Sequence, residues 1–172
     1  MDAKKNKPAA LSLPSDREIL VTRAFQAPTT AVFDAWSKAE HLQRWFACAG
    51  LTMPICEVDF REGGKWRRVL RDAAQGMDHA TSGEFREITR PDRLVFTEVY
   101  EPIPGSDHLV TLTFQEHAGG TLFTQRFLHQ SKEARDAHLR SGMENGLEAT
   151  FARLDELLSS PAVSPAAEDA RP

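Results

Sequence analysis

Apolar and polar residues alternate along most of the middle of the chain, and this period of two predicts β-strands. The first such stretch is residues 18–25, which ends just before Pro28. Six further stretches follow it, at residues 55–60, 65–71, 80–88, 94–101, 109–115 and 121–129. The segments between these six are short and contain Gly or Pro, as hairpin turns require. The pattern therefore predicts an antiparallel sheet.

Helical periodicity replaces the alternation in two regions. Apolar residues at three- and four-residue steps predict two short helices after Pro28, with a break near Ser37. Residues 131–158 predict one long helix, because Ser131 can cap its first turn and no proline follows before Pro161. This order of elements predicts an α+β domain in which a curved antiparallel sheet wraps the last helix.

One face of the predicted long helix is suited to burial. The residues that recur on it are Leu139, Met143, Gly146, Leu147, Thr150, Leu154 and Leu157. The acidic residues expected to face away from the sheet are Glu144, Glu148, Asp155 and Glu156.

Two glycines stand in the middle of this helix, and each lowers helix stability by roughly 1 kcal/mol relative to alanine. Gly142 and Gly146 either admit a closely packed strand or leave a hollow for a ligand. On the predicted strand faces, a side chain at position 146 projects toward the sheet between Phe96 and Gln125. The sequence leaves these two interpretations open.

Length and composition favour one compact domain over residues 17–158, with disordered tails at residues 1–16 and 159–172. The net charge is -4 and the charges of both signs are interspersed, which argues against a nucleic-acid or membrane-surface partner. No apolar run is long enough to span a membrane. With only Cys48 and Cys56 and no signal peptide, we expect a soluble protein of the reducing cytoplasm.

Four segments resemble a known family in order and spacing. They are REILVTRAFQAPTTAVFDAWSKAEHLQRWF, VDFREGGKWR, GEFREITRPDRLVFTEVY and GMENGLEATFARLDELL. They are similar to the domain named after the activator of the ninety-kilodalton heat-shock-protein ATPase, in the START-like (SRPBCC) superfamily. This superfamily also holds the birch-pollen allergen, polyketide cyclases and lipid-transfer domains. The resemblance implies a helix-grip fold, with a small apolar or amphipathic molecule held in a cavity between the sheet and the long helix.

Several conspicuous residues have a structural interpretation. Gly63 and Gly64 resemble the family's double glycine and are expected to form a tight turn at positive φ, since no phosphate-binding spacing surrounds them. Trp36 is expected in the core or the cavity wall, and Trp45 with Phe46 there or in a mobile gate. The six histidines show no metal-ligand spacing, so each is expected at the surface and neither metal nor cofactor is predicted.

Polar residues on apolar strand faces are the most informative feature. Arg68 lies between Trp66 and Leu70 on one strand face, where the resembled family usually has an apolar residue. An unpaired buried arginine is very costly, so Arg68 lies on the outer face, meets a carboxylate such as Glu98, or meets an anionic ligand group. Glu98 and Tyr100 share a face and are weak candidates for catalytic base and acid.

The candidate ligand-binding residues combine these polar groups with the aromatic residues and the helix stripe. They are Trp45, Phe46, Trp66, Arg68, Phe96, Glu98, Tyr100, Phe123, Gln125, Met143, Gly146, Leu147 and Thr150. The alternative is a plain internal salt bridge, or a strand register that differs from the predicted one.

Three function classes compete. The first is a protein that binds a small hydrophobic or amphipathic molecule, such as a lipid or a polyketide-like compound. The second is a cyclase- or dehydratase-like enzyme acting on such a molecule. The third is contact with the ninety-kilodalton chaperone, for which we expect little ATPase stimulation because these residues hold no second large domain. A homodimer is left open.

Overall fold

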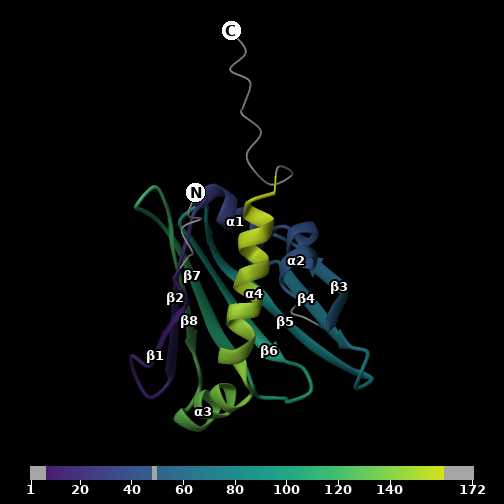
Figure 1. Cartoon of the computed structure of the whole chain (residues 1–172). Helices are drawn as coiled ribbons and strands as arrows, with labels where there is room; N and C mark the ends of the chain where they lie inside the picture. The colour runs from purple at the N-terminus through teal and green to yellow at the C-terminus, as the bar shows by residue number, and fades with distance from the viewer. Residues whose placement is uncertain (1–6, 48–49, 161–172) are drawn as a thin grey trace.

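The computed structural model describes residues 7–47 and 50–160, which form eight strands and four helices (Figure 1). In chain order the elements are β1 (Ala10–Ser12), β2 (Glu18–Phe25), α1 (Thr29–Ser37), α2 (Ala39–Trp45), β3 (Leu51–Val58), β4 (Lys65–Asp72), β5 (Met77–Thr89), β6 (Arg93–Tyr100), β7 (His108–His117), β8 (Gly120–Leu128), α3 (Lys132–Arg140) and α4 (Met143–Leu158). Cys48 and the predicted tail from residue 161 onward lie outside the described residues.

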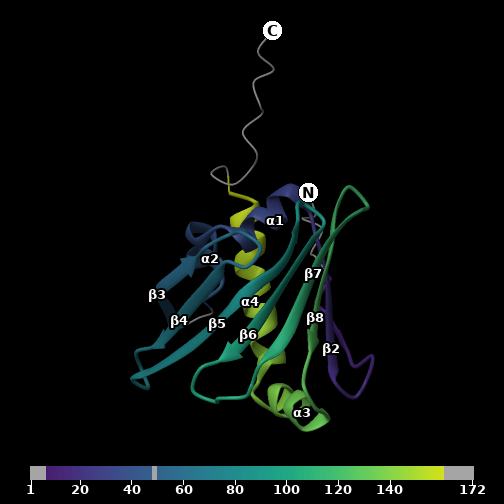
Figure 2. The same cartoon turned by 180° about the vertical axis from the view of Figure 1, so that it is seen from behind.

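The strands form one antiparallel sheet in the order β1-β2-β8-β7-β6-β5-β4-β3. From β3 to β8 each strand pairs with the next one in the chain, so the predicted meander is confirmed. β2 pairs with β8 along its whole length, from Glu18 opposite Leu128 to Phe25 opposite Thr121. Figures 1 and 2 show that the sheet curves around α4, which lies on its concave side. The predicted α+β helix-grip architecture is confirmed.

The core lies between this concave face and the helices. The alternation along β2, β7 and β8 places every second residue inward, and these side chains are almost fully buried. Phe151 of α4 packs edge-on against Phe25 and Phe123, with ring centroids 5.6 and 5.9 Å away. Burial of each such large apolar side chain contributes about 1.5–3 kcal/mol. Packing therefore holds the second half of α4 against the sheet.

The single helix predicted over residues 131–158 is wrong, because the chain forms α3 and α4 instead. The predicted cap is present, since the Ser131 hydroxyl accepts a hydrogen bond of 3.1 Å from the backbone N–H of Ala134. The break falls at Gly142, whose φ is +86°. Residues with a side chain adopt this left-handed conformation only at a cost. Gly142 is thus needed for the turn between the helices, rather than for space beside a strand.

Gly146 occupies an open position on α4. A Cβ atom built there meets no atom within 4 Å, so the interpretation of a closely packed strand at this glycine is wrong. The helix stripe also needs a second correction at Asp155, which was expected to face away. The guanidinium of Arg23, only 5% exposed, donates two hydrogen bonds to the Asp155 carboxylate, at 2.8 and 2.6 Å. A buried charge requires such a partner, and the helix supplies it.

The N-terminal region is more ordered than predicted. Within the expected tail of residues 1–16, β1 pairs with β2 and places Leu11 opposite Val21. The backbone N–H of Ala9 also donates to the Glu148 carboxylate of α4, at 2.6 Å. This segment therefore extends the sheet by one short edge strand.

The two residues of the double glycine must each be glycine, for separate steric reasons. Gly63 has a φ of +80°, which confirms the predicted positive-φ turn. Gly64 has no room for a side chain, because a Cβ atom there would lie 2.0 Å from the backbone oxygen of Asp59.

No helix within the described part of the chain is long and apolar enough to cross a membrane.

Candidate ligand cavity

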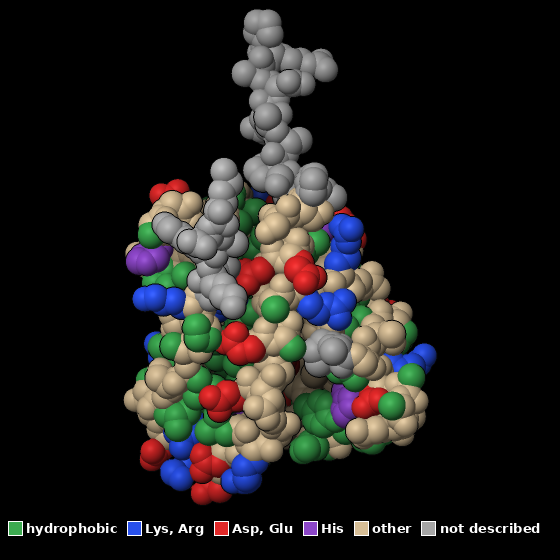
Figure 3. All heavy atoms as spheres, viewed as in Figure 1, with side chains coloured by type: hydrophobic (Ala, Val, Ile, Leu, Met, Phe, Trp, Pro, Cys, Tyr) green, Lys and Arg blue, Asp and Glu red, His purple; other side chains and the backbone are tan. Residues whose placement is uncertain are grey.

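A cavity of about 570 Å³ lies where the ends of β5, β6 and β7 meet α3 and the loop between β6 and β7. Its lining residues are His79, Thr81, Glu98, Tyr100, Ile103, Pro104, Gly105, Ser106, His108, His129, Ala134, Ala137, His138 and Ser141. The molecular surface is hollowed beside α4 (Figure 3). The cavity thus combines apolar walls with a group of polar side chains.

Strand register brings the polar side chains together. Tyr100 pairs with Thr81 of β5, and Glu98 pairs with His108 of β7. His129 directly follows β8, where its backbone N–H donates to the carbonyl of Arg17 at 2.8 Å. Residues that lie far apart in the sequence therefore meet on the concave face.

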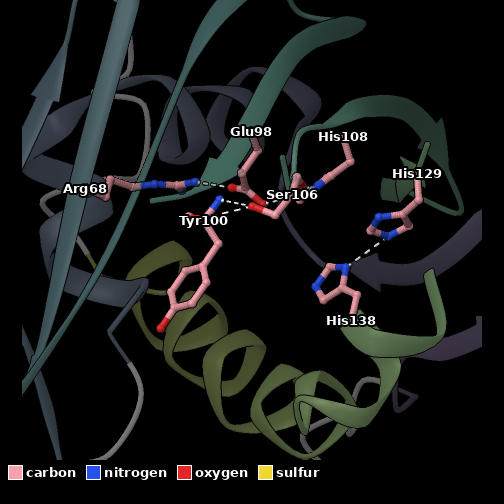
Figure 4. Close-up of polar contacts among 7 residues, drawn as sticks. All are labelled: Arg68, Glu98, Tyr100, Ser106, His108, His129 and His138. Atoms are coloured by element: carbon pink, nitrogen blue, oxygen red, sulfur yellow. Dashed lines mark hydrogen bonds and ion pairs between the residues drawn. The ribbon is translucent and has the colours of Figure 1, made fainter. Parts of the chain in front are cut away.

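An ion pair crosses the inner side of the cavity. The Arg68 guanidinium donates to Glu98 Oε2 at 2.9 Å, and His108 Nε2 lies 3.0 Å from Glu98 Oε1 (Figure 4). Burial raises the pKa of Glu98, but the hydrogen bond from His108 and the charges of Arg68 and His108 outweigh it and lower this pKa to about 2. Glu98 is therefore an anion whose two oxygens each meet a cation or an N–H donor.

His108 is held in its protonated form. Its Nδ1 lies 3.1 Å from the carbonyl oxygen of Ser106, which can only accept a hydrogen bond. Its Nε2 faces the Glu98 carboxylate, which also accepts, so both ring nitrogens carry a proton in this geometry. Burial lowers the pKa of His108, yet the hydrogen bond and charge of Glu98 and the Ser106 carbonyl raise it overall. The arrangement stabilises an imidazolium.

Arg68 has an aromatic environment as well as a carboxylate partner. Its guanidinium carbon lies 4.2 Å from the Phe46 ring centroid and 4.3 Å from that of Trp66. Burial lowers the pKa of Arg68, and the charge of Glu98 offsets only part of this effect. The guanidinium nevertheless remains charged, because the pKa of arginine starts far above neutral pH. Of the three alternatives for Arg68, the pairing with Glu98 is the one observed.

Two further imidazoles lie beside His108. The rings of His129 and His138 have centroids 4.8 and 5.4 Å from that of His108. His138 Nδ1 and His129 Nε2 are 3.1 Å apart, so one of these nitrogens donates to the other (Figure 4). Burial and the charge of His108 lower the pKa of both His129 and His138 to about 4. At neutral pH this pair is uncharged.

A phenol and a fourth imidazole form a separate pair in the same cavity. The hydroxyl of Tyr100 lies 2.8 Å from Nδ1 of His79. The backbone of Tyr100 is fixed by Ser106, whose hydroxyl accepts from its N–H at 3.0 Å and donates to its carbonyl at 3.1 Å. The tip of the Tyr100 side chain is thereby positioned within the cavity.

The predicted site residues divide into four groups. Glu98 and Tyr100 line the large cavity. Trp66, Arg68 and Phe96 line a second, much smaller cavity of about 20 Å³ on the other side of the ion pair.

Other predicted site residues belong to the core. Trp45 is fully buried and its indole N–H donates to the carbonyl of Ala35 at 2.8 Å, so it packs in the interior. Phe123 stacks on Trp36 with a centroid distance of 5.3 Å. Gln125 is buried opposite Leu112. Phe46 contributes to the site through its contact with Arg68.

The predicted helix residues are the fourth group. Met143, Gly146, Leu147 and Thr150 are half-buried on α4, but the lining of the large cavity within the described residues does not include them. The reason is the break at Gly142, which lets α3 cover this end of the sheet in place of a longer α4.

The prediction that every histidine is a surface residue is wrong for five of the six, since His117 alone is exposed. His129 is 3% exposed, the His108 side chain is 8% exposed, and His138 is half-buried. The burial of His108 could have been predicted from the alternation along β7, because His108 lies on the same strand face as Val110 and Leu112, which are buried. The described residues hold no group of three or more His, Cys, Asp or Glu side chains suited to a metal ion.

Comparison with known proteins is consistent with this architecture. The family model described as "Activator of Hsp90 ATPase homolog 1-like protein" matches residues 26–159. The chain belongs to this family. No curated protein matches it.

Solved structures share the fold over most of the chain. A protein from Rhodobacter sphaeroides is 26% identical with a TM-score of 0.83, and the match covers 88% of this chain and 98% of that one. A protein from Nitrosomonas europaea is 27% identical with a TM-score of 0.75, covering 85% and 96%. The AHSA1-like protein from Aeromonas hydrophila, at 19% identity and a TM-score of 0.68 over 81% and 93%, shares the fold alone.

Proposed function

We propose that the protein binds a small amphipathic molecule in the large cavity between the sheet, α3 and the loop after β6. The observation that carries the proposal is the cavity itself, whose volume of about 570 Å³ falls within the range of about 300–1,000 Å³ typical of small-molecule sites. Apolar residues such as Ile103, Pro104 and Ala134 favour a hydrophobic body. Tyr100 and the histidines supply groups that orient a polar end.

Saturable binding of N-phenyl-1-naphthylamine, an uncharged fluorescent probe, tests this proposal. A tryptophan in place of Ala134 on α3 fills the cavity, so the Ala134→Trp variant should bind the probe at least about tenfold more weakly, a loss of about 1.4 kcal/mol. Ala152→Trp is the matched control, because Ala152 is exposed on α4. Absence of saturable binding to the unmodified protein, or equal binding by both variants, would overturn the proposal.

An enzyme of the cyclase or dehydratase kind is the second candidate, and one observation favours it. The Tyr100 hydroxyl and His79 Nδ1, 2.8 Å apart, form a pair able to exchange a proton with a bound carbonyl compound. Glu98 is a poor base by comparison, since its cationic neighbours lower its pKa to about 2. Turnover of a polyketide-like substrate that Tyr100→Phe abolishes without weakening binding would support an enzyme.

Contact with the ninety-kilodalton chaperone remains a prediction that rests on the family alone. Co-purification and an ATPase assay with the purified chaperone test it. A several-fold stimulation at stoichiometric concentration would place this function first. Dimerisation likewise remains a prediction, for which the mass in solution is the test.

A further inference from the structure

We propose that the cavity selects amphipathic acids, whose anionic group lies against His108, His129 and His138 and whose binding is accompanied by proton uptake. This inference rests on the proposed function, because it names the ligand class of the same cavity. It is carried by the arrangement of charge and hydrogen-bonding groups at the end of the cavity next to α3.

The buried charges at this end do not cancel. Arg68 and His108 are cations, whereas Glu98 is the only acidic side chain among the described residues that line the large cavity. These three groups therefore leave one net positive charge. Desolvating such a charge is costly, and an anion placed beside it reduces that cost.

The other charged groups nearby do not remove this excess. The charge of Asp107 reaches His108 and contributes to raising its pKa, but the Asp107 side chain is exposed to water, which screens it, and lines a groove with Arg67 and Glu101. On α3, the Asp136 carboxylate accepts from Arg135 at 2.9 Å and from Lys132 at 3.0 Å, so these three groups bring no excess negative charge. The positive excess faces the cavity.

The neutral pair His129 and His138 can adapt to an anion. Since one nitrogen of each ring takes part in the 3.1 Å contact, the two remaining ring nitrogens carry one N–H and one lone pair between them. Protonation of the pair converts that lone pair into a second donor. An anionic group close to both rings stabilises the protonated form, because opposite charges favour ionisation.

The direction of the pH dependence follows from this chemistry. Without ligand, burial and the charge of His108 hold the pKa of His129 and His138 at about 4, so the pair is neutral from pH 5 upward. Glu98 raises both of these pKa values, and Arg135 lowers that of His129. A bound anion raises them further, so the complex takes up protons and its affinity increases as pH falls from 7.5 to 5.5.

Two related probes separate the effect of the anion from that of the hydrophobic body. N-phenyl-1-naphthylamine is uncharged, and 1-anilinonaphthalene-8-sulfonate adds a sulfonate that stays ionised across this pH range. We expect the affinity of the sulfonate probe for the full chain to rise about three- to tenfold from pH 7.5 to 5.5, and that of the neutral probe to change less than about twofold. Circular dichroism at each pH checks that the fold is intact.

Calorimetry in two buffers of different ionisation enthalpy measures the protons directly. Binding of the sulfonate probe should take up a fraction of a proton at pH 6, whereas the neutral probe should take up none. The double variant His129→Gln, His138→Gln should lose both the proton uptake and the rise in affinity. His117→Gln, at the exposed far end of β7, should keep both.

The outcomes distinguish this inference from the function on which it rests. Failure of the neutral probe to bind overturns the proposed function and the inference together. Normal binding of the neutral probe, with no proton uptake by the sulfonate probe, overturns the acid selectivity alone. Proton uptake that persists in the double variant also overturns it, because His129 and His138 would then not be its source. The proton measurement on the unmodified protein decides the matter even if the double variant does not fold.

Discussion

At the scale of single residues, the cavity is defined by charges that the strand register brings within hydrogen-bonding distance. Arg68, Glu98 and His108 lie on β4, β6 and β7, and their side chains are only 6%, 16% and 8% exposed. Because a lone buried cation is costly, the sequence left three alternatives for Arg68, and pairing with a carboxylate such as Glu98 was one of them. The sequence did not predict the participation of His108, since separation in the sequence hides proximity across strands.

Replacing Glu98 by glutamine should destabilise the protein strongly. The variant leaves the buried guanidinium of Arg68 and the imidazolium of His108 without their shared anion. Removing one partner of a buried ion pair typically costs about 3–5 kcal/mol. Urea unfolding of Glu98→Gln measures the change.

The matched control is Glu101→Gln, which removes the exposed ion pair between Arg67 and Glu101. Exposed pairs contribute about 0–1 kcal/mol, so this variant should unfold close to the unmodified protein. Equal losses in the two variants would show that the buried charges carry no special stabilising role.

At the scale of elements, the turn between α3 and α4 determines which helix covers the cavity. The sequence indicated the helical region, the N-cap and most of the stripe. It failed at Gly142, because a glycine inside a periodic stretch is compatible with both a tolerated helix position and a left-handed turn. The lining expected from α4 therefore comes from α3.

Alanine at the two glycines should change stability in opposite directions. Gly142→Ala forces a side chain into a φ of +86° and should cost roughly 1–2 kcal/mol. Gly146→Ala meets nothing within 4 Å and should stabilise α4 by up to about 1 kcal/mol. Thermal unfolding of both variants is the measurement. The same sign for both substitutions would contradict the assignment of the turn to Gly142.

At the scale of the whole molecule, the architecture was predictable because one face of nearly every strand is apolar and the turns are short. The added edge strand β1 escaped prediction, since a strand of three residues has too few positions for alternation to be recognised. The position of the cavity also escaped it, because that position depends on how α3 is placed against the sheet.

Stability of the whole domain should depend on pH through the cavity. His129 and His138 have folded-state pKa values of about 4, below the ordinary value of 6.5, so the unfolded chain binds more protons between these limits. Stability therefore falls as pH drops from 6.5 to 4. Glu98, with a folded-state pKa of about 2 against 4.5, adds a further loss as pH drops from 4.5 to 2.

Denaturant unfolding at a series of pH values measures this profile. The double variant His129→Gln, His138→Gln should flatten it between pH 6.5 and 4 and leave the loss at lower pH in place. His117→Gln, which alters an exposed histidine, should keep the unmodified profile. A profile that stays unchanged in the double variant would contradict the neutral, buried state of this pair.

The cavity is lined partly by strands and partly by segments outside the sheet, and this has an evolutionary consequence. Half of the wall belongs to the loop between β6 and β7 and to α3, neither of which takes part in the hydrogen-bonded ladders of the sheet. Substitutions at Ile103, Pro104, Ala134 or Ala137 change the shape of the cavity without disturbing strand pairing. A lineage can thus acquire a new ligand by drift in these short segments while the scaffold is inherited intact.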